Sequence, residues 1–122
     1  MHLSQTTPIL RSFDEAKARE FYLQFLGFEV VFEHRFDNSG PLYMGIRRGD
    51  CMLHLSEHHG DATPGAAMRI AVSDIDAFAA ELAAKDYRHG RPHLQDTPWN
   101  TRDMTLSDPF GNHLTFTTAI ST

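Results

Sequence analysis

The order of structural elements predicted from the sequence repeats once, and this duplication constrains the fold more than any other feature of the chain. A short apolar strand at 8–10 precedes a helical pattern at 14–26, and three further strands follow before residue 57. A strand at 68–72 and a helix near 74–86 begin the same order again, about sixty residues later. A half of this size buries too little surface to be stable alone. The two halves must therefore pack together or against a second chain, which makes a shared cleft natural.

Apolar stripes and capping signals predict the two helices. The first stripe has helical spacing and consists of Ala18, Phe21, Tyr22, Phe25 and Leu26. Ser12 and Glu15 are spaced as a capping box, and Gly27 lies where a left-handed C-terminal cap is expected. In the second helix, either Ser73 or Asp74 is the predicted N-cap.

The other ordered segments are predicted to be strands, because they are rich in β-branched and aromatic residues and are bounded by turn residues. In chain order these strands are 8–10, 28–36, 42–47, 51–56, 68–72, 103–107 and 113–118. The segment 57–65 has no periodicity and is predicted to be a loop.

Composition and charge exclude several classes of protein. The chain has 122 residues, the size of a single domain spanning 1–122, with 16 acidic and 11 basic side chains and a net charge of −5. A nucleic-acid-binding protein would need a basic face, and no apolar run approaches the roughly twenty residues of a membrane span. Cys51 is the only cysteine, which excludes an internal disulfide and fits a reducing compartment. We therefore expect a cytoplasmic protein with neither a nucleic acid nor a membrane as its partner.

Two motifs carry a resemblance to a known family. The sequence Ala-Arg-Glu-Phe-Tyr at 18–22 leads to Leu-Gly-Phe-Glu-Val at 26–30, and Asp-Pro-Phe-Gly-Asn-His-Leu-Thr-Phe spans 108–116. With this separation, in a duplicated chain, these motifs resemble the vicinal oxygen chelate superfamily of glyoxalase I, bleomycin-resistance proteins and extradiol dioxygenases. The Arg-Gly-Asp turn at 48–50 and the Pro-Trp-Asn-Thr-Arg segment at 98–102 are most similar to the bleomycin-resistance branch.

The resemblance implies an α+β fold of two βαβββ modules, at about 5–57 and 66–118 of one domain. It also implies a homodimer with ligand clefts at the interfaces between modules or subunits. Asp108 and Asn112 of the second motif are expected to be turn residues that serve backbone geometry. The fold alone does not fix the function, so the site has to be argued from its own residues.

The metal site of the enzymatic relatives is not expected in this chain. Those relatives hold a divalent ion with two side chains from each module, and the corresponding positions fall at Thr7, His54, Ala67 or Met68, and Thr115. Such an ion needs carboxylate or imidazole ligands, and only His54 can provide one. The resemblance therefore predicts no metal, no other cofactor and no catalytic residue.

A histidine cluster offers a different metal hypothesis. His54, His58 and His59 are close in sequence, and a spacing of four residues returns to the same face of a strand, with Glu57 nearby. The competing interpretation is that 58–61 is a solvated loop. We favour the loop, because no second histidine pair at zinc-site spacing completes four ligands.

Five side chains are predicted to line a ligand cleft: Trp99, His54, Phe36, Tyr43 and Arg102. Trp99 is the only tryptophan and lies in a polar stretch, where its flat face can stack on a planar ligand or contact a cation. His54 can orient a ligand through a hydrogen bond. The competing interpretations are a loop anchor for Trp99 and a structural histidine for His54. Phe32 shares a strand face with Phe36 by parity.

Two functions from different classes are compatible with these observations. The first is a binding protein that sequesters a bleomycin-like or other drug without turnover, which we favour because the metal ligands are missing and the charge is acidic. The alternative is a metal-dependent glyoxalase, lyase or dioxygenase-like enzyme with a displaced metal site. That enzyme would need His54 together with carboxylates such as Glu29, Glu33 or Glu57. Binding of an unrelated metabolite is a third interpretation.

Overall fold

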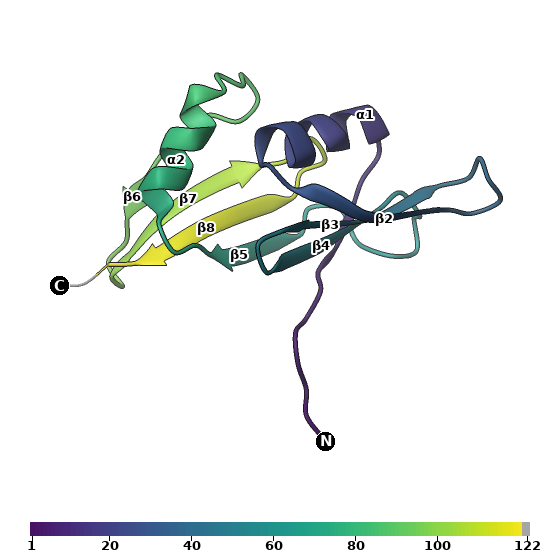
Figure 1. The fold of residues 1–122 in the computed structure, drawn as a ribbon, viewed down its shortest axis with the longest axis horizontal. Coiled ribbons are helices and arrows are strands. Elements are labelled where there is room, and N and C mark those ends of the chain that lie inside the picture. The colour runs from purple at the N-terminus through teal and green to yellow at the C-terminus, as the bar shows by residue number, and fades with distance from the viewer. Residues whose placement is uncertain (121–122) are drawn as a thin grey trace.

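Two four-stranded sheets, each with a helical segment against one face, form the structure (Figure 1). It is a computed structural model that describes residues 1–120. The first sheet has the order β1 (Ile9–Arg11), β4 (Cys51–Ser56), β3 (Leu42–Arg48), β2 (Glu29–Arg35). The second has the order β5 (Ala67–Ala71), β8 (His113–Ala119), β7 (Thr101–Ser107), β6 (Gln95–Asp96). Strand β1 pairs with β4 in parallel, and β5 pairs with β8 in the same way, so the predicted α+β fold of two βαβββ modules is confirmed.

The first helical segment differs from its prediction at both its start and its winding. Helix α1 (Glu15–Ala18) continues as a π-helix, η1 (Arg19–Phe25), in which Leu26 N donates to Phe21 O. The N-cap is Asp14, whose carboxylate accepts from Lys17 N at 3.0 Å. The predicted capping box at Ser12 is wrong, because Ser12 N donates to Ser56 O and this holds the residue against the sheet. The left-handed cap is confirmed at Gly27, with φ of 79°.

The second helix, α2 (Ile75–Ala84), begins at the cap that the sequence left open between two residues. Asp74 accepts from Ala77 N at 3.1 Å and is therefore the N-cap. The predicted strands are present, with ends that differ by one or two residues. Strand β6 was not predicted, since two residues are too few to show a periodicity. No helix of residues 1–120 is long and apolar enough to cross a membrane.

The core lies between each sheet and its helix, and both helices lie on the same side of the two sheets (Figure 1). Strand alternation sends one set of side chains toward the helices, where they are buried. In the first sheet this set includes Leu10, Leu42, Met44, Ile46, Leu53 and Leu55. The opposite face of each sheet has no helix over it. The N-terminal segment leads away from the body of the molecule (Figure 1).

A buried polar network joins the two modules. Tyr22 Oη donates to Asp108 Oδ2 at 2.6 Å, across 86 residues of sequence. Asn112 Nδ2 donates to the same carboxylate oxygen at 2.7 Å and to the backbone oxygen of Arg11 at 3.0 Å. Tyr22 and Asn112 are fully buried, and Asp108 is 6% exposed. The turn geometry expected of Asp108 and Asn112 is present, and the pair also fixes the first module against the second.

This network makes a prediction for alkaline solution. Burial, with a smaller contribution from the charge of Asp108, raises the pKa of Tyr22 well above its usual 10.0. Above that pH the unfolded chain releases the tyrosine proton while the folded protein retains it, so the stability from this group is lost as pH rises. We expect Tyr22→Phe to show a shallower loss of unfolding free energy above pH ~10 than the wild type, measured by urea denaturation. Parallel pH profiles would contradict the assignment.

Candidate functional site

The helix-free face of the first sheet, here called the open face, carries two neighbouring rows of side chains. Strand register places one residue of each strand in each row, and the rows lie about 7 Å apart. From β1 to β2, one row is Arg11, Ser56, Tyr43 and His34, and the next is Ile9, His54, Gly45 and Phe32.

Phe32, Tyr43 and His54 form an aromatic platform on the open face. The Phe32 and Tyr43 rings are nearly parallel, 15° apart with centroids at 6.1 Å, and Phe32 meets His54 edge to face at 5.1 Å. Phe32 remains 39% exposed. Its ring lies over Gly45, where any Cβ atom would overlap it. The missing side chain at Gly45 therefore lets the platform lie flat on the sheet.

Tyr43 fixes the protonation of His54. Tyr43 Oη lies 2.7 Å from His54 Nδ1. Partial burial keeps the pKa of His54 below its usual 6.5, and burial with the nearby Asp61 charge raises the pKa of Tyr43, so both groups are neutral at pH 7. A phenol donates more strongly than a neutral imidazole, so the hydroxyl donates to Nδ1 and the ring proton is on Nε2. The platform thus includes a neutral imidazole with one N–H donor.

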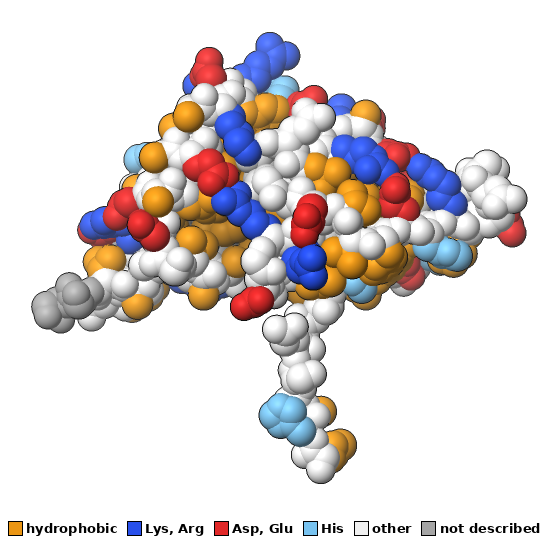
Figure 2. Space-filling model, in the orientation of Figure 1, with side chains coloured by type: hydrophobic (Ala, Val, Ile, Leu, Met, Phe, Trp, Pro, Cys, Tyr) orange, Lys and Arg blue, Asp and Glu red, His pale blue; other side chains and the backbone are white. Residues whose placement is uncertain are grey.

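Phe36 lies at the hairpin end of the same sheet, among histidines. It meets His34 at 5.0 Å and His58 at 5.5 Å between ring centroids, and His58 stacks on His59 at 5.0 Å. Figure 2 shows pale blue histidine side chains beside hydrophobic atoms at this end of the molecule. The structure therefore brings together three of the five predicted site residues, His54, Tyr43 and Phe36, along one sheet.

The residues at the family's metal positions do not fit a divalent ion. In the register of the strands, His54 lies opposite Ile9, and Thr115 lies opposite Arg69, so neither has a second ligand beside it. Ala67 is on the helix-free side of its strand, and Met68 points to the helix side. Within residues 1–120, no three His, Cys, Asp or Glu side chains are grouped to hold a metal.

The carboxylates that an enzyme would need beside His54 are engaged elsewhere. Glu57 accepts from the backbone N–H of Leu42 at 2.9 Å, and Glu29 pairs with Arg47 at 3.0 Å. Glu33 forms an ion pair with Arg19. The second metal hypothesis, with His54, His58 and Glu57, has no geometric support, because this glutamate is directed to the backbone.

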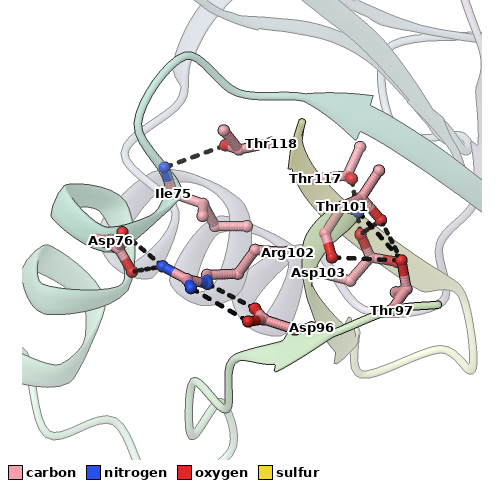
Figure 3. A network of polar contacts seen from close by, with 9 residues as sticks. All are labelled: Ile75, Asp76, Asp96, Thr97, Thr101, Arg102, Asp103, Thr117 and Thr118. Carbon is pink, nitrogen blue, oxygen red and sulfur yellow. Dashed lines mark hydrogen bonds and ion pairs between the residues drawn. The ribbon is translucent and has the colours of Figure 1, made fainter. Parts of the chain in front are cut away.

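Trp99 and Arg102 lie on the second sheet, away from the platform. Trp99 is 64% exposed in the turn between β6 and β7, and Figure 1 shows β6 and β2 at opposite ends of the molecule. Arg102 shares strand parity with the buried Met104 and therefore points to the helix side. There it bridges Asp96 at 2.6 Å and Asp76 at 3.0 Å, as Figure 3 shows. Within one copy of the chain, these two residues cannot meet a ligand on the platform.

The helix-free face of the second sheet is lined by hydroxyl groups. Thr101 and Thr117 donate to Asp103 at 2.9 and 2.6 Å, and Arg69 pairs with the same carboxylate at 3.1 Å (Figure 3 shows the threonines). Hydrogen bonds from these groups lower the pKa of Asp103, against an opposing effect of burial. This face is polar where the open face of the first sheet is aromatic.

A cavity of about 760 Å³ lies on the helix side, between the β3–β4 turn and α2. Arg48 on its wall pairs with both oxygens of Glu81, at 2.6 and 2.8 Å, and stacks on Phe78 at 4.9 Å. Cys51, also on the wall, is half-buried, and burial raises the pKa of its thiol. The charges of this ion pair are compensated and the thiol is not activated, so we place no candidate site on these three side chains.

Two βαβββ modules that each leave one sheet face open define a protein of the vicinal oxygen chelate class. The family model described as "Glyoxalase superfamily protein" matches residues 1–121, and the chain belongs to that superfamily. No curated protein matches the sequence.

Solved structures of similar proteins include both binding proteins and an enzyme. The bleomycin-binding protein of bleomycin-producing Streptomyces verticillus, complexed with copper(II)-bleomycin, is 30% identical, with 99% of each chain covered and a TM-score of 0.71. A second bleomycin-binding protein, complexed with bleomycin, is 26% identical over 95% of this chain and 98% of that one, with a TM-score of 0.71. A lactoylglutathione lyase from Agrobacterium tumefaciens is 18% identical over 94% and 92% of the two chains, with a TM-score of 0.71, and shares the fold.

Two residues of the open face were missing from the predicted site. Phe32 was signalled by its parity with Phe36, but its place in the platform depends on Gly45, which sequence pattern does not connect to it. Arg11 follows an apolar strand and carries no pattern that marks it. Its burial, with 8% of its surface exposed, is visible only in the structure.

Proposed function

We propose that the protein binds a small molecule with planar rings on the open face of the first sheet and holds it without turnover, as a bleomycin-type sequestering protein. The observation that carries this proposal is the exposed aromatic platform of Phe32, Tyr43 and His54. Aromatic faces stack on planar rings and attract cations, and the neutral His54 supplies one hydrogen bond for orientation. The similarity to two bleomycin-binding proteins supports bleomycin as the first ligand to test.

The same proposal includes a homodimer. One copy offers only half of a cleft, because the platform is open and Trp99 follows β6, which lies at the other end of the molecule from β2 (Figure 1). A second copy that places its second sheet opposite the platform would bring the partner subunit's Trp99 and a row of hydroxyl groups to the ligand. The net charge of −5 on each chain favours a cationic ligand, such as bleomycin. We propose that this binding takes place in the cytoplasm.

The test is a titration of the purified protein with bleomycin, followed by calorimetry and by the fluorescence of Trp99. We expect saturable binding near one ligand per chain, with Kd of about 1 µM or tighter, and quenching of Trp99 over the same range. Calorimetry reports that the drug binds, whereas the quench reports that Trp99 lies near the ligand.

A Trp99→Phe variant separates the two statements. If it keeps the calorimetric affinity, Trp99 contributes no binding energy and the drug binds elsewhere on the protein. If the affinity falls by about tenfold, Trp99 is part of the site. If a folded wild-type protein shows no heat and no quenching at bleomycin concentrations up to ~1 mM, the proposed drug binding is refuted.

A further inference from the structure

Arg11 is a buried cation that lacks an acceptor in the described chain. Its residue surface is 8% exposed, and within residues 1–120 no acceptor is in hydrogen-bond reach of its Nη1. The guanidinium carbon lies 4.6 Å from the centre of the Phe13 ring. An aromatic face stabilises a cation but accepts no conventional hydrogen bond, so Nη1 has no acceptor among residues 1–120.

Other arginines of the chain are more exposed and yet paired. Arg48 and Arg69 lie 2.6 and 3.1 Å from carboxylates, with side chains 38% and 50% exposed. No ion pair among the described residues includes Arg11. Removing a guanidinium from water without a partner costs several kcal/mol, so the acceptor is expected to come from outside this copy of the chain.

The position of Arg11 connects it to the platform. Its register partner is Ser56 in β4, whose register partner in β3 is Tyr43. All three belong to one row on the helix-free side of the sheet, in which Ser56 is fully buried. The row that holds His54 and Phe32 is about 7 Å away, the spacing of alternate residues in a strand. Asp61, in the loop that follows β4, accepts from Ser56 Oγ at 2.7 Å and lies 3.6 Å from His58 Nδ1.

We propose that Arg11 binds the anionic group, a carboxylate or a phosphate, of a small molecule whose rings lie on the aromatic platform. A guanidinium presents a planar fork of N–H donors that matches both oxyanions. The spacing of the two rows admits a ligand with its charge beside an aromatic ring. This inference rests on the proposed use of the open face as a ligand site, and it extends that use to a class of ligand other than cationic drugs.

Small aromatic probes that differ only in charge test the proposal on the full-length protein. Benzoate and phenyl phosphate carry the two anions, and benzamide is the matched neutral compound. We expect both anions to shift the Arg11 Nε–Hε resonance in nitrogen–proton NMR spectra, saturably, while benzamide leaves it in place. The anion with the lower Kd identifies which oxyanion the site prefers.

Two variants complete the test. Arg11→Met keeps an apolar stem of similar length, and Arg88→Met removes an exposed arginine as the matched control. We expect Arg11→Met to weaken benzoate and phenyl phosphate binding about tenfold or more, with no change in Arg88→Met. Without ligand, Arg11→Met should raise Tm by about 3 °C or more, because an unpaired buried charge has been removed.

The outcomes separate this inference from the proposed drug binding. Unchanged anion affinity in Arg11→Met, or an Arg11 resonance that no anion moves, overturns the anion site. A fall in particle mass caused by Arg11→Met alone would also overturn it, since the acceptor would then belong to a second copy. If the protein binds the anions but not bleomycin, the anion site at Arg11 is supported and the proposed drug binding is refuted. Should Arg11→Met not fold, the wild-type NMR titration still decides.

Discussion

An Asn112→Asp variant is expected to lose about 3–5 kcal/mol of unfolding free energy at pH 7. Asn112 is fully buried, and its Nδ2 donates to Asp108 Oδ2 at 2.7 Å and to Arg11 O at 3.0 Å. The substitution keeps the shape of the side chain but replaces two donated hydrogen bonds with an acceptor that faces two acceptors. A second carboxylate would then lie beside Asp108 in a buried site.

The loss should depend on pH in a defined direction. Repulsion and burial raise the pKa of the introduced carboxyl group in the folded protein above its unfolded value of about 3.9. The folded variant therefore binds more protons than its unfolded chain at neutral pH, and its stability increases as pH falls. Urea denaturation between pH 8 and pH 5 should show the gap from the wild type narrowing.

Asn112→Ala is the control for this prediction. It removes the same hydrogen bonds without adding a charge, so it should destabilise the protein by about 2–4 kcal/mol with no added pH dependence. If Asn112→Asp and Asn112→Ala lose equal stability at every pH, the close contact between position 112 and Asp108 is refuted.

Local sequence patterns predicted the structure correctly where the residues of one helix or strand are enough to determine it. The apolar stripes located both helices, and Gly27 ended the first of them. The predicted cap of that helix, Ser12, was wrong, and the N-cap is Asp14. Ser12 N donates instead to Ser56 O of a distant strand, a tertiary contact that no local pattern shows. Periodicity over seven residues also does not distinguish an α-helix from the π-helix that follows.

The faces of the strands explain what could be predicted of the site. Arg102 is two and four residues before the apolar Met104 and Leu106 and therefore shares their face of the strand. Its position on the helix side could have been inferred from this parity alone. In β2 the register shifts between Val30 and Phe32, so counting alternate residues from the start of the strand fails. Tertiary pairing with Gly45 sets the orientation of Phe32, and no local pattern contains that information.

A Phe32→Ala variant is expected to weaken bleomycin binding by about tenfold to a hundredfold. The ring supplies the exposed part of the aromatic platform, stacked on Tyr43 and over Gly45. Because it is 39% exposed, its removal should cost little stability, so the loss reports on binding. Calorimetry measures the affinity, and Phe32→Trp, which keeps a flat aromatic side chain, is the control that should retain most of it.

Gly45→Ala tests the geometry of the platform while leaving every ring in place. Its methyl group would occupy the space of the Phe32 ring and force that ring off the sheet, so its affinity should fall toward that of Phe32→Ala. The double variant should bind no more weakly than Phe32→Ala, because residues that act through one contact are not additive. Additive losses would mean that Gly45 contributes independently of Phe32. Unchanged affinity in both single variants would show that the drug does not bind on the open face.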